Sequence, residues 1–322
     1  MVQIYREEDA SLDSLAGKKL GVIGYGNQGS AQAKNLRDSG LEVVVGNRED
    51  PAKERAKEDG FETTGIAEAA SEADVVFVLI PDEVQKEVFA EQIEPGLEEG
   101  DCLVFASGYN VYYEFVNPPN YVDVVMVAPR MIGEGVRNLY QSGKGFPCFI
   151  GVNQDYSDLA QKKALAIGKA IGGTKGGAIA SSFREETLID LFAEQFLWAG
   201  INKLCETFYD KLVEMECSPE AIATELYLSG EMVEVAEAMI ETGFFKQLEL
   251  HSQTSQYGQL SRGDRVITEE VEEEAEEILE EIRDGEFARE WETEQIVGKP
   301  TLKKLKKAAF AHPLNEIEEE LK

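Results

Sequence analysis

The feature that most constrains this fold is an apolar segment that runs directly into a glycine-rich turn. Residues 19–29 read Lys-Leu-Gly-Val-Ile-Gly-Tyr-Gly-Asn-Gln-Gly, so Gly24, Gly26 and Gly29 have the spacing Gly-x-Gly-x-x-Gly. In a dinucleotide-binding fold, the first glycine permits a tight turn and the second lets the backbone approach a pyrophosphate. The third lets the next helix pack closely on its strand. The alternative is a glycine-rich turn in an unrelated α/β protein.

The segments around the turn favour the dinucleotide site. Residues 28–38 have helical composition, and a second apolar run, residues 41–45, ends in Gly-Asn before Arg48, Glu49 and Asp50. Acidic residues after the second strand are typical of the position that contacts the cofactor's ribose. We therefore expect a bound dinucleotide. The turn residues expected to contact it are Gly24, Tyr25, Gly26, Asn27, Gln28 and Gly29.

Composition limits the class of protein. The chain has 322 residues, 43% of them hydrophobic, which suffices for about two globular domains. Its 62 acidic and 31 basic residues give a net charge of −31, which disfavours nucleic acid and anionic membranes as partners. Adaptation to a high-salt cytoplasm and ordinary acidity both explain this charge. We expect a cytoplasmic protein with no membrane span and no signal peptide, whose four scattered cysteines are reduced.

The two halves of the chain differ in their hydrophobic pattern. From residue 19 to about residue 152, short apolar runs alternate with helix-like segments, which predicts a parallel, doubly wound sheet. After about residue 182, apolar residues recur at helical spacing. The fold class is therefore α/β, with a Rossmann-type domain over residues 1–181 and an all-helical domain over residues 182–322. The expected strands are residues 20–24, 41–45, 75–80, 102–105, 124–128 and 148–152. The expected helices of the second half are residues 185–208, 219–241, 269–283, 287–291 and 302–307.

The first helix of the second half carries two carboxylates four residues apart. Asp190 and Glu194 would share one helix face, where like charges repel unless a proton or a cation joins them. A second acidic helix offers Glu225, and oxygen ligands alone suit Mg²⁺. The alternative is that these acids simply face solvent. With only two histidines in the chain, a zinc site and a serine–histidine triad are poorly supported.

Taken in order, these features resemble ketol-acid reductoisomerase of the short, bacterial and archaeal type. Members of that family convert 2-aceto-2-hydroxy acids into 2,3-dihydroxy acids, by a Mg²⁺-dependent alkyl shift followed by hydride transfer from a nicotinamide. The resemblance implies this activity in valine and isoleucine synthesis, a 2-keto or 2-aceto-2-hydroxy acid substrate, and a homodimer or larger assembly. The matching stretches are residues 22–29, 81–85 (Pro-Asp-Glu-Val-Gln), 123–129 (Asp-Val-Val-Met-Val-Ala-Pro), 185–187, 190–195 (Asp-Leu-Phe-Ala-Glu-Gln) and 285–291 (Gly-Glu-Phe-Ala-Arg-Glu-Trp).

The resemblance also implies roles for individual residues. Asp190 and Glu194 would hold Mg²⁺ from one helix, with Glu194 also serving catalysis. Glu225 would add a ligand across a dimer interface, because the helical domains of the family interlock. Ser252 would contact the substrate carboxylate. Further cofactor contacts would come from Asp82, Glu83, Val84, Gln85 and Gly133.

Several positions depart from the family's pattern. Typical members carry a histidine where this chain has Ser107, a lysine where it has Arg130, and a ligand glutamate where it has Ser229. They also carry Pro-Gly-His in place of residues 132–134. Ser107 and Arg130 are thus candidate catalytic residues with altered chemistry, since arginine does not reproduce the proton transfer of lysine. Three functions stay open: the full reaction, reduction of another 2-keto acid without isomerisation, and a catalytically silent nucleotide-binding protein.

The second strand's end bears on the choice of nicotinamide. Family members usually prefer NADPH and bind its 2′-phosphate with an arginine and hydroxyl residues. Here Arg48 remains, but Glu49 and Asp50 follow it. A carboxylate accepts a hydrogen bond from the ribose 2′-hydroxyl and repels a 2′-phosphate. We expect NADH to be favoured over NADPH; the alternative is that both acids face solvent.

Overall fold

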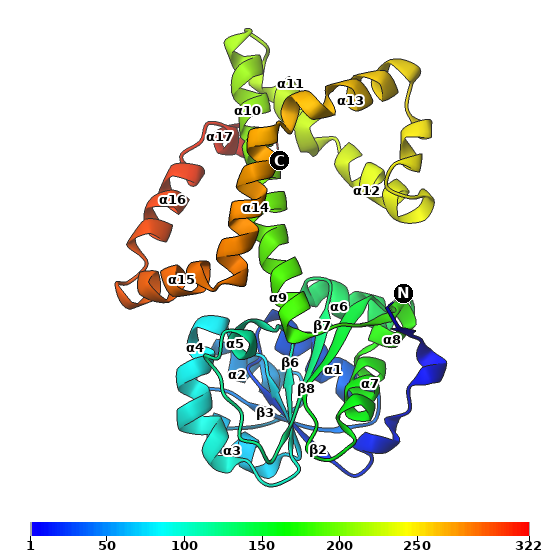
Figure 1. Cartoon of the computed structure of the whole chain (residues 1–322), viewed down its shortest axis with the longest axis vertical. Coiled ribbons are helices and arrows are strands. Elements are labelled where there is room, and N and C mark those ends of the chain that lie inside the picture. Colours follow the sequence, from blue (N-terminus) through cyan, green and yellow to red (C-terminus); the bar gives the residue numbers. More distant parts are fainter. Residues whose placement is uncertain (1, 322) are drawn as a thin grey trace. The chain divides into compact units, whose positions relative to one another are not determined.

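The computed structural model describes residues 2–321 of the chain. It divides into two compact units, which meet between Ile189 and Asp190 (Figure 1). This boundary falls within α9 (Phe183–Phe192), slightly later than the boundary expected after residue 181. The reason is that the first turns of α9 pack on the first unit, where Phe183 belongs to a buried apolar cluster.

The first unit is built on a nine-stranded sheet. Its strands are β1 (Ile4–Tyr5), β2 (Lys19–Ile23), β3 (Glu42–Gly46), β4 (Glu62–Thr64), β5 (Val75–Val78), β6 (Cys102–Phe105), β7 (Asp123–Pro129), β8 (Cys148–Gln154) and β9 (Ala178–Ala180). The spatial order is β1-β9-β8-β7-β6-β5-β2-β3-β4, and the strands from β7 to β4 are parallel. This is the strand order of a dinucleotide-binding fold, whose ligand crevice opens between β2 and β5.

The sequence predicted a parallel sheet, but the sheet is mixed. β8 runs antiparallel to β7, and β1 runs antiparallel to β9. After β7 the chain passes through α6 (Gly133–Gln141) and turns at Gly143 and Gly145, whose φ angles are 73° and 69°. It enters β8 at the edge where β7 ends, and there the Arg130 amide donates to the Pro147 carbonyl (3.0 Å). The short strands β1, β4 and β9 lie outside the expected set, since two or three residues show no hydrophobic period.

Helices cover both faces of this sheet, and alternate strand residues enter two separate cores. On one face, Leu20 and Val22 of β2 pack in a cluster with α1 (Asn27–Asp38) and α7 (Ala160–Ile171); on the other, Ile23 joins the cluster of α3 (Ile66–Glu72). The other helical segments of this unit are η1 (Glu7–Asp9), η2 (Leu12–Leu15), α2 (Pro51–Glu58), α4 (Asp82–Val88), η3 (Phe89–Ile93), η4 (Glu94–Gly96), α5 (Tyr109–Tyr112) and α8 (Gly173–Gly176).

All regular elements among the described residues of the second unit are helical, as expected. Its segments are η5 (Ala193–Trp198), α10 (Ala199–Glu214), α11 (Pro219–Ala223), η6 (Thr224–Leu228), α12 (Glu231–Thr242), η7 (Lys246–Leu250), α13 (Gln253–Val266), α14 (Glu269–Arg283), α15 (Glu286–Ile296), α16 (Pro300–Phe310) and α17 (Leu314–Leu321). The helix expected over residues 219–241 is interrupted at Gly230, whose φ is 83°. None of the described helices is both long and apolar enough to cross a membrane.

The second unit leaves much of its apolar surface exposed within one chain. Large side chains of α12, α13 and the segment between them are open to solvent, including Ile240 (86% exposed), Phe245 and Leu260. The buried apolar side chains of this unit are Leu191, Tyr209, Ile222, Ala223, Ile282 and Ala288. Among its described residues, the second unit thus has a small core and a large exposed apolar surface.

Candidate functional site

The glycine turn after β2 has the geometry of a phosphate-binding turn. Gly24 has a φ of 97°, and a Cβ there would lie 2.6 Å from the Leu79 carbonyl oxygen. A Cβ at Gly29 would lie 2.0 Å from the Gly24 carbonyl oxygen, so the helix packs directly on the turn. A Cβ at Gly26 would meet no atom within 4 Å. Packing therefore requires Gly24 and Gly29, while Gly26 leaves an open face that fits a pyrophosphate.

Two helix N-termini meet beside this turn. A Cβ at Gly133 would lie 2.1 Å from the Asn27 carbonyl oxygen, so α6 begins against the start of α1. Neither helix has a side-chain cap, and a hollow of about 340 Å³ next to both is lined by Ser30, Lys34 and Arg137 among others. Uncapped amides at converging helix N-termini attract an anion. Gly133, Asn27 and the turn therefore come together as expected.

Tyr25 can offer a cofactor only its backbone. Its side chain is 1% exposed, its hydroxyl donates to Asp59 Oδ2 (2.8 Å), and its ring packs edge-on against Phe61. Burial, and then the hydrogen bond with Asp59, raise the pKa of Tyr25 above its ordinary value. The side chain is thus a structural anchor of the turn.

The expected contacts at residues 82–85 belong to a hydrogen-bonded corner. Asn110 Nδ2 donates to Asp82 Oδ1 (2.9 Å), and Gln85 Nε2 donates to the Ile80 carbonyl (3.0 Å) and to Asp82 Oδ1. Gln85 is buried, yet its Oε1 has no hydrogen-bond partner among the described residues. A buried acceptor left in this way fits a ligand that donates, such as a cofactor hydroxyl or amide. Glu83 and Val84 are exposed beside it.

Ser107 and Arg130 lie at the carboxyl ends of the adjacent parallel strands β6 and β7, and Glu186 of α9 joins them. Arg130 Nη1 donates to Glu186 Oε1 (2.8 Å), and the Gly108 amide donates to Glu186 Oε2 (2.6 Å). The guanidinium also stacks on Phe149, 4.9 Å from its centroid. Arg130 is therefore held in place as a cation that can bind an anion.

Glu186 is a candidate functional residue that the sequence analysis missed. Its side chain is 1% exposed, although it carries a carboxylate. A Cβ at Gly108 would lie 2.2 Å from the Phe183 carbonyl oxygen, so α9 packs directly on the Ser107 turn. Glu186 precedes Asp190 by one helical turn, a spacing that could have singled it out. In the sequence, Glu186 stands beside Glu185, and such adjacent acids are typical of an exposed helix face.

The three expected Mg²⁺ ligands occupy unusual helical geometry. Glu194 lies in η5 and Glu225 in η6, both π-helical segments inserted between α-helices, while Asp190 lies near the end of α9. π-helical insertions are rare and recur at functional sites. Three carboxylates supply the oxygen ligands that Mg²⁺ prefers, so the donor set fits that ion. Within the described part of one chain these three do not form a compact cluster, because the one such cluster found lies elsewhere.

Two serines discussed above lie at the starts of helices, where Ser252 is the N-cap of α13 and Ser229 precedes Gly230, the N-cap of α12. Ser252 is exposed at the start of α13, where its Oγ accepts from the Ser255 amide (3.2 Å). Ser229 stands at the place of the family's fourth ligand, and its Oγ accepts from the Glu231 amide (3.3 Å) at the start of α12. Each hydroxyl still has a proton to donate, so Ser252 can bind a carboxylate.

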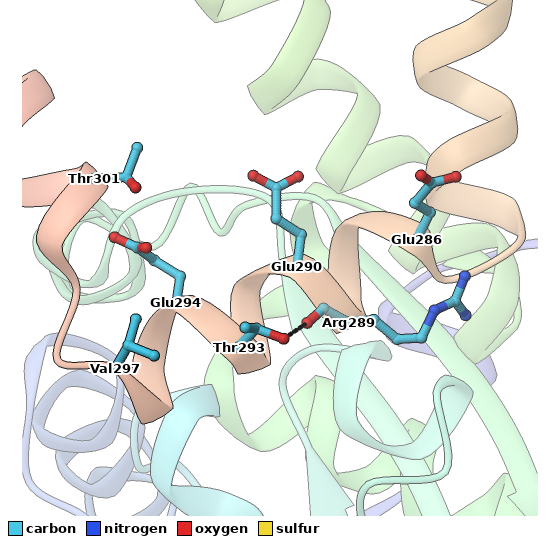
Figure 2. Close-up of a pocket in the computed structure, with 7 residues that line it drawn as sticks. All are labelled: Glu286, Arg289, Glu290, Thr293, Glu294, Val297 and Thr301. Atoms are coloured by element: carbon cyan, nitrogen blue, oxygen red, sulfur yellow. Dashed lines mark hydrogen bonds between the residues drawn. The ribbon is translucent and has the colours of Figure 1, made fainter.

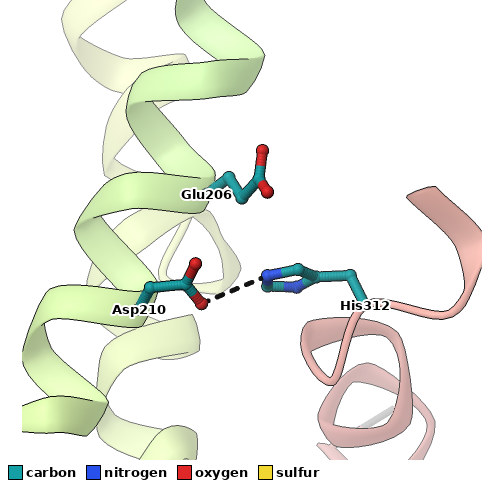
Figure 3. A group of neighbouring side chains, drawn as sticks. All are labelled: Glu206, Asp210 and His312. Atoms are coloured by element: carbon teal, nitrogen blue, oxygen red, sulfur yellow. Dashed lines mark ion pairs between the residues drawn. The ribbon is translucent and has the colours of Figure 1, made fainter. Parts of the chain in front are cut away.

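A second possible metal centre in the helical unit is less suitable. Glu206, Asp210 and His312 lie close together, and His312 Nε2 is 3.3 Å from Asp210 Oδ1 (Figure 3). The Leu314 amide donates to His312 Nδ1 (3.3 Å), which places the proton of the neutral ring on Nε2. That proton must leave before Nε2 can bind a metal. The cluster instead fastens the start of α17 to α10.

A hollow of about 670 Å³ lies along α15, but its lining residues are not arranged for catalysis. The carboxylates of Glu286, Glu290 and Glu294 follow one another along the helix (Figure 2). Arg289 Nη1 donates to the Asp284 carbonyl (3.1 Å). Glu294 has a structural role, because its Oε1 accepts from the Leu302 amide (2.9 Å) in the first turn of α16. The row is a solvated acidic face.

Comparison with known proteins covers the whole chain. The family model described as "Acetohydroxy acid isomeroreductase, NADPH-binding domain" matches residues 14–177. The model described as "Ketol-acid reductoisomerase, C-terminal domain" matches residues 183–322. The two models meet between residues 177 and 183, close to the start of α9.

Individual relatives agree with the family models. The chain is 45% identical to the ketol-acid reductoisomerase (NADP(+)) of Methanopyrus kandleri and 43% identical to that of Pyrobaculum calidifontis, in each case over 100% of the chain and 98% of the relative. It is 38% identical to a solved NADH-preferring ketol-acid reductoisomerase from an uncultured archean, with a TM-score of 0.95 over 99% of this chain and 98% of that one. These comparisons confirm the resemblance inferred from the motifs.

Proposed function

The chain belongs to the ketol-acid reductoisomerase family, and we propose that it converts 2-acetolactate into 2,3-dihydroxyisovalerate with a nicotinamide cofactor and Mg²⁺. The observation that carries this proposal is the joined constellation at the strand ends. Glu186 binds both Arg130 and the amide of Gly108, the residue after Ser107, at the carboxyl ends of β6 and β7, and Asp190 follows Glu186 on the same helix. The reaction belongs to branched-chain amino-acid synthesis in the family.

The first unit would hold the cofactor and orient the substrate. The turn from Gly24 to Gly29 and the start of α6 would bind the pyrophosphate, and the nicotinamide supplies a hydride when bound. Arg130, fixed by Glu186, would attract the anionic substrate and stabilise negative charge on its oxygens. Ser107 is placed to donate a hydrogen bond, since its Oγ accepts from the Tyr109 amide (3.2 Å) and its hydroxyl proton stays available.

The carboxylates of the second unit would complete the site. Asp190 and Glu194 would hold Mg²⁺, with Glu225 contributed by a second copy of the chain and Ser252 contacting the substrate carboxylate. Bound Mg²⁺ polarises the substrate's carbonyl and hydroxyl oxygens, which favours both deprotonation and migration. Glu194, besides acting as a ligand, is the carboxylate proposed to accept the substrate's proton.

The assembly is proposed to be a homodimer or a larger homo-oligomer. The exposed apolar side chains of α12 and α13 support this proposal, since a second copy offers the same surface. The cytoplasm is the proposed compartment, where its free cysteines stay reduced. Burial raises the pKa of both Cys102 and Cys148 to about 12, so these two thiols are unreactive.

A second candidate function is reduction without isomerisation. Arg130 in place of the family's lysine, and Ser229 in place of a ligand glutamate, favour it, because the alkyl shift makes the stricter demand on charge placement. Reduction alone needs a nicotinamide, polarisation of one carbonyl and a proton donor.

The two functions separate in one assay. The purified protein with Mg²⁺ and NADH or NADPH is tested on 2-acetolactate and on 3-hydroxy-3-methyl-2-oxobutyrate, the rearranged intermediate. We expect cofactor oxidation with both. Oxidation with the rearranged compound or a simple 2-keto acid, but not with 2-acetolactate, supports the reductase. If 2-acetolactate, the rearranged compound and simple 2-keto acids all leave the cofactor unoxidised, both enzymatic functions are contradicted.

A further inference from the structure

The loop after β3 and the first turn of α2 together contain two cations and two carboxylates within six residues. Arg48, Glu49, Asp50 and Lys53 lie at the end of the second parallel strand, where this fold contacts the adenosine ribose of its cofactor. A ribose 2′-hydroxyl needs an acceptor there, whereas a 2′-phosphate needs cations. The pairing of these four side chains therefore bears on which nicotinamide is bound.

Asp50 is fully engaged in building the loop. Its Oδ1 accepts from Asn47 Nδ2 (2.8 Å), the Ala52 amide (2.8 Å) and the Lys53 amide (3.2 Å), and its Oδ2 accepts from Arg48 Nε (2.9 Å). The ion pair with Arg48 lowers the pKa of Asp50. Asp50 is thus the N-cap of α2 and the counter-ion of Arg48, which leaves Glu49 as the carboxylate open to a ligand.

Glu49 in turn holds the ammonium of Lys53. The Lys53 side chain is 9% exposed and donates to Glu49 Oε1, whereas the Glu49 side chain is 79% exposed. An ammonium is strongly hydrated, so a buried lysine needs a compensating partner. Among the described residues, the carboxylate of Glu49 is the one that forms an ion pair with this ammonium, and it stands on the solvent side of the loop.

We propose that Glu49 rejects a 2′-phosphate by occupying Lys53, and that Lys53 is a latent ligand for that phosphate. The inference rests on the proposed use of a nicotinamide and deepens the expected preference for NADH. With both cations already paired inside the loop, NADPH must displace a carboxylate before its phosphate can bind. The ribose of NADH needs only an acceptor, which the exposed carboxylate of Glu49 supplies.

The test compares the two cofactors in four variants of the full-length protein. These are Glu49→Gln, Lys53→Met, the double variant, and Glu54→Gln as a matched control. Glu54 pairs with Lys57 on the same helix (2.7 Å), and both side chains are exposed. The ratio of kcat/KM for NADPH to that for NADH is measured, together with the ratio of the Kd values for NADP⁺ and NAD⁺.

We expect Glu49→Gln to raise the relative preference for the phosphorylated cofactor by about tenfold or more, the effect of one charge-assisted hydrogen bond. The double variant should lose that gain, and Glu54→Gln should show none. A gain that survives the loss of Lys53 would mean that Glu49 acts by repulsion alone and would overturn the inference. So would an unchanged ratio in Glu49→Gln.

The binding arm keeps the inference separate from the proposed reaction. If the protein fails to turn over 2-acetolactate but the Kd ratios shift as described, the reaction is wrong and the role of Lys53 stands. If turnover is normal but Glu49→Gln changes neither the kcat/KM ratio nor the Kd ratio, the proposed reaction stands and the proposed role of Lys53 is wrong. The melting temperature of Glu54→Gln should match that of the wild type, since Glu54 and Lys57 are both exposed. Glu49→Gln should melt lower, because it leaves the buried Lys53 ammonium without its partner, and the double variant should recover part of that loss.

Discussion

The two units of this molecule reach stability by different means. The first buries alternate residues of nearly every strand in two cores, one on each face of the sheet. The second buries few apolar side chains and exposes many, most of all along α12 and α13. The first unit thus has its cores within one chain, whereas the second leaves an apolar surface for the second copy that we propose. Under the proposed function their roles differ accordingly: the first unit holds the nucleotide, and the second contributes carboxylates.

The largest contrast should appear in stability. Leu36 of α1 is fully buried, and Leu36→Ala should cost about 2–5 kcal/mol of unfolding free energy through lost burial and a cavity. Ile240 of α12 is exposed in a single chain, so Ile240→Asp should leave the first unit's unfolding unchanged and weaken self-association. Denaturant unfolding and sedimentation at several concentrations measure the two effects. A monomeric wild-type protein would remove the contrast.

Removing an expected metal ligand should impair turnover without affecting cofactor binding by the first unit. Asp190→Asn should lower Mg²⁺-dependent turnover by more than about 100-fold, because one charged oxygen ligand is lost. Binding of NADH, measured by fluorescence titration, should not change. Asp210→Asn, on α10 and outside the proposed site, is the matched control. Equal loss in both variants would show a general effect on the helical unit.

A smaller effect is expected where the first unit positions its own charged groups. Glu186→Gln keeps an acceptor for the Gly108 amide but removes the charge that holds Arg130. We expect kcat to fall about 10- to 100-fold, the worth of one charge-assisted hydrogen bond, with the KM for NADH unchanged. Glu185→Gln, on the exposed side of the same helix, is the control. A change in KM for NADH alone would place Glu186 in cofactor binding.

The smallest expected effect concerns pH and the first unit alone. Burial by itself would raise the pKa of Asp123, but Lys163 (2.6 Å) and Ser157 together hold it below its ordinary value. A lowered folded pKa means that this stabilisation is present above about pH 4 and is lost as pH falls through the folded value. Replacing both partners, by Asp123→Asn with Lys163→Met, should flatten the acid side of the melting-temperature profile. An unchanged profile would contradict the assignment.

The sequence predicted the first unit better than the second. The Gly24–Gly29 turn and the six longer strands were found because their signals are local: glycine spacing and apolar runs. The antiparallel direction of β8 was not found, because it depends on a reversal at Gly143 and Gly145 that has no hydrophobic period. Glu186 was missed for a related reason: its burial is created by Arg130 and Gly108, which are distant in sequence.

In the second unit, helical spacing revealed helices but not their interruptions. The π-helical segments around Glu194 and Glu225 change the direction of side chains without changing the pattern of apolar residues. The expectation that Asp190 and Glu194 share one face assumed a regular α-helix, whereas Glu194 lies in the π-helical segment that follows α9. Ser252 is the N-cap of α13, and a serine directly before a helix is a local signal that can be recognised in a sequence.

Subunit complementation tests most directly whether the site is divided between two copies. Asp190→Asn and Glu225→Gln are each expected to be inactive, and co-expression of the two chains produces mixed dimers. If Asp190 and Glu225 of one site come from different copies, each mixed dimer has one intact site. Random assembly then restores about a quarter of wild-type turnover with 2-acetolactate, Mg²⁺ and NADH. Turnover that stays at the level of the separate variants would contradict this account.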